Sequence, residues 1–215
     1  MGRLQALGSN MSSHLQHGRR RLFLHMLSLC VLGLPVCGLH ANVDAPPALM
    51  LASRWQKGLD PSVYWVSEKL DGVRAYWDGH RLCFRSGRPI AAPAWFTTDL
   101  PAIALDGELW LGRGRFEALS GLVRRDTVDD AGWRQIRYLI FDLPGNEGSF
   151  DQRLSLMHAL IDGVAPPWLQ VLPQFRVADP VVLAATLARV VGSGGEGLML
   201  HRANAHWQPG RSDAL

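Results

Sequence analysis

Residues 67–79 read SEKLDGVRAYWDG, and they join two β-type runs, YWVSEKL at 64–70 and VRAYW at 73–77. Lys69 lies near the end of the first run, Gly72 lies between the runs, and Arg74 lies near the start of the second. Apolar and aromatic residues are frequent in both runs, which is typical of short strands. The Asp-Gly-His turn at 78–80 separates the second run from a further β-type segment, RLCFRS at 81–86. We therefore expect a β-hairpin directly after the Leu-Asp-Gly step.

The rest of the chain continues this mixture of short strands and isolated helices. Further strands are expected where β-branched and aromatic residues gather, at 103–111, 136–143 and 195–202. Helices are expected where the apolar spacing is helical, at 115–123, 151–163 and 179–192. Asp179 and Pro180 predict the start of the last helix, and Gly192 and Gly194 predict its end. This pattern favours an α+β domain with antiparallel sheets over a regular βαβ array.

The composition allows an ordinary folded domain. The 215 residues are 47% apolar and 19% charged, which excludes collagen, coiled-coil and disulfide-scaffold classes. The net charge of +3 suggests a nucleic-acid or anionic-membrane partner. However, residues 1–41 hold four arginines and no acid, so the other 174 residues carry 18 basic and 19 acidic groups. The net charge of that part is −1, and it gives no support for DNA binding.

The N-terminal segment has the pattern of a secretory signal peptide. Arg19, Arg20 and Arg21 precede the apolar run LFLHMLSLCVLGLPVCGL at 22–39. We expect a leader at 1–41 and one periplasmic domain at 42–215, without stable membrane association once the leader is removed. The alternative is an uncleaved membrane anchor, because the run is long enough for a spanning helix. Cys83 is then the one cysteine outside the leader, which excludes an internal disulfide or a cysteine-based metal cage in that domain.

Lysine is rare in this chain. Arginine outnumbers it twenty to two, and the two lysines are Lys57 and Lys69. What lysine offers and arginine does not is a nucleophilic amine once the proton is lost. The ordinary lysine pKa is about 10.4, so a reactive Lys69 needs desolvation or a nearby cation, and Arg74 is close in sequence.

Lys69 begins the pattern K-x-D-G-x-R at 69–74, and here the sequence resembles the covalent nucleotidyltransferases, the superfamily of polynucleotide ligases and capping enzymes. The segments that follow are similar, in order and spacing, to the successive motifs of ATP-dependent DNA ligases. They are RSG (85–87), LDGEL (105–109), YLIFD (138–142), EGLML (196–200) and PGRSDAL (209–215). Together with the leader, SEKLDGVRAYWDG most resembles the small bacterial ligases thought to act in the periplasm.

The resemblance implies an antiparallel-sheet, ATP-grasp-like adenylation domain that seals nicks in double-stranded DNA with ATP and Mg²⁺. Lys69 would attack ATP and carry AMP. The implied nucleotide contacts are Glu68, Asp71, Gly72, Arg74, Glu108 and Phe141. The implied DNA or phosphate contacts are Arg85, Arg88 and Arg211, and the implied Mg²⁺ ligands are Glu108 and Glu196. Phe84 stands where the family usually has Ser or Thr, so the resemblance does not determine the geometry around Arg85.

Several of these residues also have structural interpretations. Asp106 and Asp142 could be solvated turn residues, Phe141 could be ordinary core, and Arg85 could be a surface charge. His201 and His206 receive no role from the resemblance. Of the eight tryptophans, Trp77 and Trp110 fall on the alternation of expected strands, which favours core packing over base stacking.

In the family, the GRS segment (210–212 here) is followed by a K-x-K strand and then by an oligonucleotide-binding (OB) barrel. This chain ends at Leu215, so we expect an incomplete adenylation domain without the OB-fold domain, with reduced adenylation. The alternatives are an inactive nucleotide-binding fragment, an RNA ligase or capping-type enzyme, and an NAD-dependent ligase. The short region before Lys69 argues against the NAD-dependent ligase, because it leaves little room for a nicotinamide-binding domain. The expected partner is nicked duplex DNA, with a monomeric protein and no protein partner.

Overall fold

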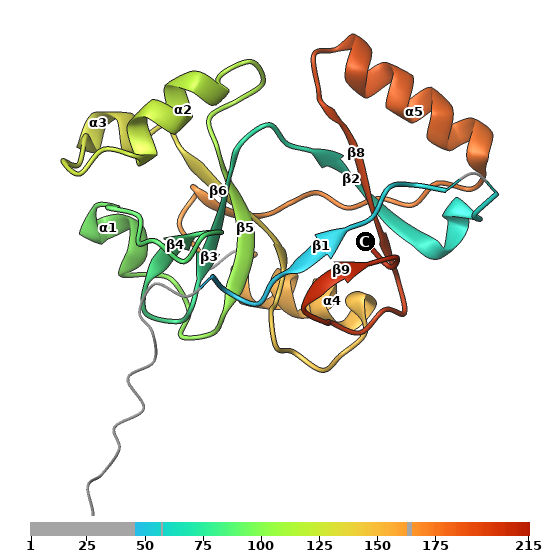
Figure 1. Cartoon of the computed structure of the whole chain (residues 1–215), viewed down its shortest axis with the longest axis horizontal. Coiled ribbons are helices and arrows are strands. Elements are labelled where there is room, and N and C mark those ends of the chain that lie inside the picture. The colour runs from blue at the N-terminus through green and yellow to red at the C-terminus, as the bar shows by residue number, and fades with distance from the viewer. Residues whose placement is uncertain (1–45, 57, 163–164) are drawn as a thin grey trace, which may run out of the picture. The chain divides into compact units, whose positions relative to one another are not determined.

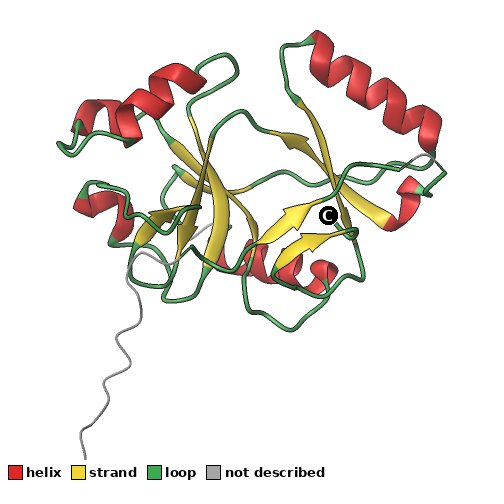
Figure 2. Cartoon of the chain, in the orientation of Figure 1, coloured by secondary structure: helices red, strands yellow, loops and turns green. Residues whose placement is uncertain are grey.

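The computed structural model describes residues 46–56, 58–162 and 165–215, so the expected leader at 1–41 lies outside the described residues. The described strands form one five-stranded sheet and two two-stranded sheets (Figures 1 and 2). The strands are β1 (Met50–Ala52), β2 (Tyr64–Lys69), β3 (Val73–Trp77), β4 (Leu82–Phe84), β5 (Leu105–Trp110), β6 (Arg137–Asp142), β7 (Leu169–Val171), β8 (Gly197–Arg202) and β9 (Gly210–Ser212). The large sheet has the order β4-β3-β5-β6-β7, while β2 pairs with β8 and β1 with β9.

The helices lie between the strands as the sequence predicts, with three short additions. They are η1 (Pro61–Val63, a 3₁₀ turn), α1 (Ala94–Thr97), α2 (Phe116–Val123), α3 (Asp130–Trp133), α4 (Phe150–Ile161) and α5 (Pro180–Gly192). Asp179 caps α5 by accepting hydrogen bonds from the backbone of Val181 and Val182, which confirms the predicted start. None of the helices in the described ranges has the length and apolar character that a membrane span requires.

Two strand pairs differ from the expected antiparallel arrangement. β6 pairs with β7 in parallel, and so does β1 with β9. Helix α4 connects β6 to β7 and packs against both, which returns the chain in the same direction, as a parallel pair requires. The remaining pairs, β2–β8, β3–β4, β3–β5 and β5–β6, are antiparallel, so the expected α+β fold with antiparallel sheets is confirmed. The two parallel pairs are features that the sequence did not predict.

The main core lies against the five-stranded sheet and is rich in aromatic residues. Trp77 is buried there, and its indole donates a hydrogen bond to the Pro101 carbonyl at 2.7 Å, which confirms core packing for this residue. Trp110 is half-buried, with the Arg137 guanidinium 5.0 Å from its ring centre. Cys83 is buried in β4.

Residues 69–73 carry the chain from the β2–β8 sheet into the five-stranded sheet. Lys69 lies opposite Gly197 of β8, and Val73 lies opposite Leu109 of β5. Between them, a Cβ placed on Gly72 would lie 2.5 Å from the Leu109 carbonyl oxygen and 2.6 Å from Cγ of Glu108. The chain passes so close to β5 that no side chain fits at position 72, and this approach brings Lys69 near the residues of the other sheet.

We predict that Gly72→Ala destabilises the protein by about 1–3 kcal/mol, because the added methyl group overpacks against a backbone oxygen. Urea unfolding followed by circular dichroism measures the change.

The matched control is Gly121→Ala within α2, where a Cβ would meet no atom within 4 Å. Alanine favours the helix at this exposed position, so the control should be neutral or more stable than the parent. Equal effects of the two substitutions would contradict the close approach at Gly72.

Candidate active site

A pocket of about 320 Å³ opens where the β2–β8 sheet meets the five-stranded sheet, within the size range of small-molecule sites. It gathers eight of the residues singled out in the sequence, namely Glu68, Lys69, Asp71, Gly72, Arg74, Glu108, Phe141 and Glu196. The other lining residues are Ala52, Ser67, Leu70, Leu172, Gln174, Met199, His201 and Leu215. The pocket is therefore built from segments that are far apart in the sequence.

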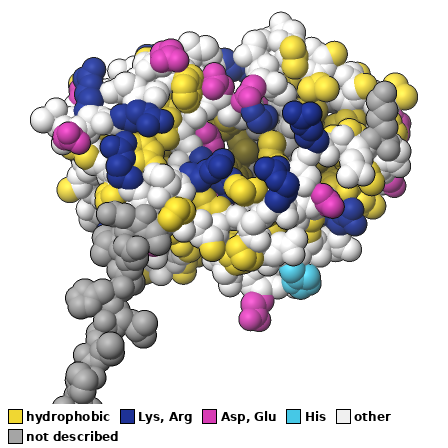
Figure 3. All heavy atoms as spheres, in the orientation of Figure 1, with side chains coloured by type: hydrophobic (Ala, Val, Ile, Leu, Met, Phe, Trp, Pro, Cys, Tyr) yellow, Lys and Arg dark blue, Asp and Glu magenta, His cyan; other side chains and the backbone are white. Residues whose placement is uncertain are grey.

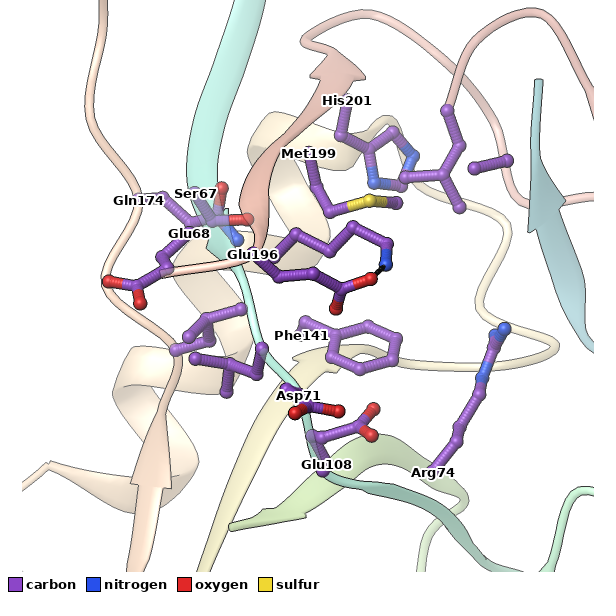
Figure 4. Close-up of a pocket in the computed structure, with 16 residues that line it drawn as sticks. Ser67, Glu68, Asp71, Arg74, Glu108, Phe141, Gln174, Glu196, Met199 and His201 are labelled. Carbon is purple, nitrogen blue, oxygen red and sulfur yellow. Dashed lines mark hydrogen bonds and ion pairs between the residues drawn. The ribbon is translucent and has the colours of Figure 1, made fainter. Parts of the chain in front are cut away.

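Lys69 and Glu196 form an ion pair at one wall of this pocket (Figure 4). Lys69 is the last residue of β2, and Glu196 directly precedes β8, so the pairing of these two strands brings the side chains together. Both side chains remain accessible, with exposed fractions of 46% and 42%. Because only the uncharged amine is nucleophilic, this ion pair must open before Lys69 can attack a substrate.

Asp106 and Arg74 form a second, more buried pair behind the pocket. Arg74 Nε and Nη2 donate to the two Asp106 carboxylate oxygens at 3.0 and 2.6 Å, and Nη2 also donates to the Met50 carbonyl at 2.8 Å. Asp106 is only 1% exposed, so its interpretation as a solvated turn residue is wrong. Arg74 is thus oriented by Asp106, and Lys69 is paired with Glu196 instead of facing this guanidinium.

Burial perturbs the carboxyl groups on β5. It raises the pKa of Glu108 from 4.5 to about 8, helped by Asp106 and Glu196 and opposed by Arg74 and Lys69. Burial also raises the pKa of Asp106 to about 6, although the Arg74 ion pair acts in the opposite direction. Without a bound cation, Glu108 is therefore largely protonated at neutral pH. Such perturbed groups in a pocket are typical of functional sites.

The end of β6 is fixed by another buried ion pair. Arg153 is fully buried, and it donates to Asp142 through Nε at 2.6 Å and through Nη2 at 3.2 Å. Asp142 also accepts from the Leu143 backbone at 2.8 Å, so it too is not a solvated turn residue. The neighbouring Phe141 is half-buried and lines the pocket, with the Arg74 guanidinium 5.4 Å from its ring centre. The ring is thus part of the pocket wall instead of the closed core.

His201 lines the same pocket, although no sequence pattern gave it a role. Its ring stacks on Phe150 at a centroid distance of 3.6 Å, and Nε2 lies 3.4 Å from Nη2 of Arg153. Burial lowers the pKa of His201 to about 4, so it is a neutral wall residue at neutral pH. His206 lies outside the pocket, with Nδ1 2.6 Å from the Glu147 carbonyl oxygen.

Glu68 borders the pocket but points away from its centre. Its carboxylate accepts two hydrogen bonds from Arg113, each at 2.7 Å, and Figure 4 shows it directed away from Glu108 and Glu196. Arg113 also donates to the Ser193 carbonyl at 3.1 Å, which links the loop after β5 to the end of α5. Sequence reasoning missed Arg113, and the Gly-Arg-Gly run at 112–114 after a strand is the signal that could have found it.

The predicted DNA-contacting arginines lie outside the pocket lining. Arg85 and Arg88 are exposed in the turn after β4, and Arg211 is exposed in β9, where it donates to the Ala52 carbonyl at 2.6 Å. Their roles therefore stay predictions.

Two carboxylates of the pocket fit the chemistry of Mg²⁺. Among the described residues there is no cluster of three His, Cys, Asp or Glu side chains that could hold a metal alone. Mg²⁺, however, is commonly bound by one or two carboxylates together with substrate phosphates and water. Glu108 and Glu196 supply such oxygen donors within the pocket that Lys69 also lines.

The raised pKa of Glu108 gives a testable dependence of stability on pH. Between pH 4.5 and 8 the unfolded chain loses this proton while the folded chain keeps it, so the stability contributed by Glu108 is lost as the pH rises. Relative to Glu108→Gln, the free energy of unfolding of the parent should fall by more than about 1 kcal/mol from pH 5 to pH 8. Urea unfolding with EDTA and without nucleotide measures it.

Glu117→Gln on the exposed face of α2 is the control, and it should follow the parent at both pH values. Parallel pH profiles for the parent and Glu108→Gln would contradict the raised pKa.

Comparisons with known proteins find similarity to DNA ligases. No protein-family model matches the chain. A DNA ligase of Haemophilus influenzae is 36% identical over 152 residues, which are 70% of this chain and 56% of the relative. The chain thus spans little more than half the length of this curated relative.

Solved structures give the same result. A structure from a study of Lig E DNA ligases is 41% identical, with a TM-score of 0.75 over 78% of this chain and 66% of the other. The Chlorella virus DNA ligase-adenylate, at 17% identity and a TM-score of 0.63 over 78% of this chain and 65% of the other, shares the fold. Sequence and fold together show that this chain is similar to DNA ligases over more than two thirds of its length, and that it shares the fold of a ligase-adenylate structure.

Proposed function

We propose that this chain is an ATP-dependent DNA ligase that seals nicks in duplex DNA through an AMP group bound to Lys69. The observation that carries the proposal is the position of Lys69, one of only two lysines, in a pocket with Glu108, Glu196 and Phe141. The similarity to proteins named DNA ligases supports it.

In the first reaction, Lys69 Nζ attacks the α-phosphorus of ATP. A nitrogen–phosphorus bond forms, the bond to the bridging oxygen of pyrophosphate breaks, and the lysine proton passes to solvent. The amine becomes available when the ion pair with Glu196 opens. Glu196 and Glu108 would then hold Mg²⁺, which supplies positive charge that offsets the charge of the phosphates.

The pocket offers separate contacts for the base and the phosphates of the nucleotide. The half-buried ring of Phe141 provides an apolar face on which adenine can stack. Met199 lies on the other side of Glu196 from Phe141 in Figure 4 and offers a second apolar surface. Within the described residues, Arg74 uses Nε and Nη2 for hydrogen bonds, which leaves Nη1 for a phosphate oxygen.

The second and third reactions use the bound AMP to join DNA. The 5′-phosphate at the nick attacks the phosphorus of AMP and releases the lysine, which gives a DNA end activated by AMP. The 3′-hydroxyl then attacks the 5′-phosphorus, the phosphodiester bond forms, and AMP leaves. Each reaction replaces one bond at phosphorus by another, so no further co-reactant is needed.

We expect Lys69→Ala to abolish covalent labelling of the protein by ATP labelled at the α-phosphorus, because no other group in the pocket provides a nucleophilic amine. Gel electrophoresis after incubation with labelled ATP and Mg²⁺ measures the label. In the parent the label should be released by acid, as a nitrogen–phosphorus bond requires, and it should transfer to nicked DNA.

Lys57→Ala removes the only other lysine and is the matched control, which should label like the parent. A Lys69→Ala protein that labels as well as its parent would exclude Lys69 as the nucleophile. A parent that binds ATP but takes no label would leave a nucleotide-binding function in place of the ligase proposal. Label transfer to nicked RNA but not to DNA would favour the RNA-ligase alternative.

A further inference from the structure

Phe84 ends β4 at the position where the sequence departs from the ligase pattern, and a tight turn brings Arg88 back to its ring. The Phe84 amide donates to the Arg88 carbonyl at 2.8 Å, and the Gly87 amide donates to the Phe84 carbonyl at 2.9 Å. Gly87 has a positive φ of 90°, which glycine adopts readily. As a result, the Arg88 guanidinium lies 4.7 Å from the centre of the Phe84 ring.

A second arginine reaches the same ring from a different element. Arg124 follows the last turn of α2, and its guanidinium lies 5.6 Å from the centre of the Phe84 ring. Its Nε donates to Oγ of Ser120 at 2.9 Å, which fixes the side chain on the helix. Phe84 itself is buried, so the ring is a rigid base for two exposed guanidinium groups.

These arginines lack the carboxylate partners that several other surface arginines have. Arg81, Arg113, Arg125 and Arg134 each lie within 4 Å of a carboxylate oxygen. In the described part of the chain, Arg85, Arg88 and Arg124 make no such ion pair, although all three are exposed. Figure 3 shows Lys and Arg side chains gathered on the part of this face that carries β4 and α2. This region therefore presents three arginines whose charge is not neutralised by an ion pair within the described residues.

We infer that Phe84 holds Arg88 and Arg124 as a pair of contacts for backbone phosphates of duplex DNA, next to Arg85. This inference rests on the proposed function, because it names a further surface by which the ligase would hold its substrate. A guanidinium above an aromatic ring is attracted to it and loses conformational freedom before binding, so less entropy is lost when a phosphate binds. Contacts of this kind position the duplex without reading its sequence.

Arg124→Gln in the full-length protein tests the inference. The dissociation constant for a fluorescently labelled nicked duplex should rise by roughly five- to tenfold, and the slope of its logarithm against log salt should fall by about 1. Fluorescence anisotropy between 50 and 200 mM salt measures both quantities. An unnicked duplex of the same length should show the same loss, because a backbone contact does not need the nick.

Arg176→Gln is the matched control. Arg176 is also exposed, lies over an aromatic ring at 5.1 Å from the centre of Trp65, and has no carboxylate partner within the described ranges. Its substitution removes the same charge and the same type of ring contact, and it should leave the dissociation constant within twofold of the parent.

Phe84→Leu tests the role of the ring, because leucine keeps an apolar side chain in the core but offers no aromatic face. The dissociation constant should rise by about two- to threefold. If this buried substitution prevents folding, the Arg124→Gln measurement decides the inference alone.

Two results would overturn the inference. One is an Arg124→Gln protein that binds both duplexes as Arg176→Gln does. The other is a loss confined to DNA with a 5′-phosphate at the nick, which would assign Arg124 to that phosphate instead of the backbone. The binding measurement uses no ATP, so it is independent of the labelling of Lys69. A missing label on Lys69 contradicts the proposed function. An unchanged DNA affinity of the Arg124→Gln protein contradicts only this inference.

Discussion

The close approach of Gly72 to β5 is the constraint on which the pocket depends. At this point the chain leaves the β2–β8 sheet and enters the five-stranded sheet, and no side chain fits between residue 72 and the Leu109 carbonyl. The nucleophile candidate Lys69 ends one sheet, while Arg74 and Glu108 belong to the other. A wider separation at Gly72 would move these groups apart, so a packing requirement of the backbone sets the geometry of the chemistry.

The buried charges behind the pocket serve its geometry more than its stability. Pairs such as Arg74–Asp106 and Arg153–Asp142 are costly to desolvate, and apolar residues of the same volume are often equally stabilising. Here each pair holds a pocket element, because Asp106 orients Arg74 and Asp142 fixes the end of β6 beside Phe141. Among the described residues Glu108 has no such ion-pair partner, which is why burial raises its pKa so far and why a bound cation would be favourable there.

Residue patterns within one segment predicted the strands and helices formed by that segment. Most of the wrong predictions concern residues or strands whose interaction partners lie far away in the sequence. Residue spacing predicted the start and end of α5 and the six strands β2–β6 and β8. The ligase resemblance singled out Lys69, Glu108 and Phe141 before their pocket was visible. Asp106 was misjudged because a carboxylate is normally exposed unless it is paired, and its partner Arg74 lies 32 positions away. Likewise, β7 has only three residues, too few for a periodic signal, so the parallel β6–β7 pair was missed.

The distribution of ion pairs over the surface says more about DNA binding than the net charge does. Residues 42–215 carry a net charge of −1, which by itself argues against a polyanionic substrate. Yet many of their carboxylates are already paired with arginines, at Asp106, Asp130, Asp142 and Glu68 among others. The acids thus neutralise arginines in specific places, and Arg85, Arg88 and Arg124 remain without carboxylate partners on one exposed face of the described structure. Because phosphate binding depends on local cations and the counterions they displace, a nearly neutral domain can hold DNA at such a face.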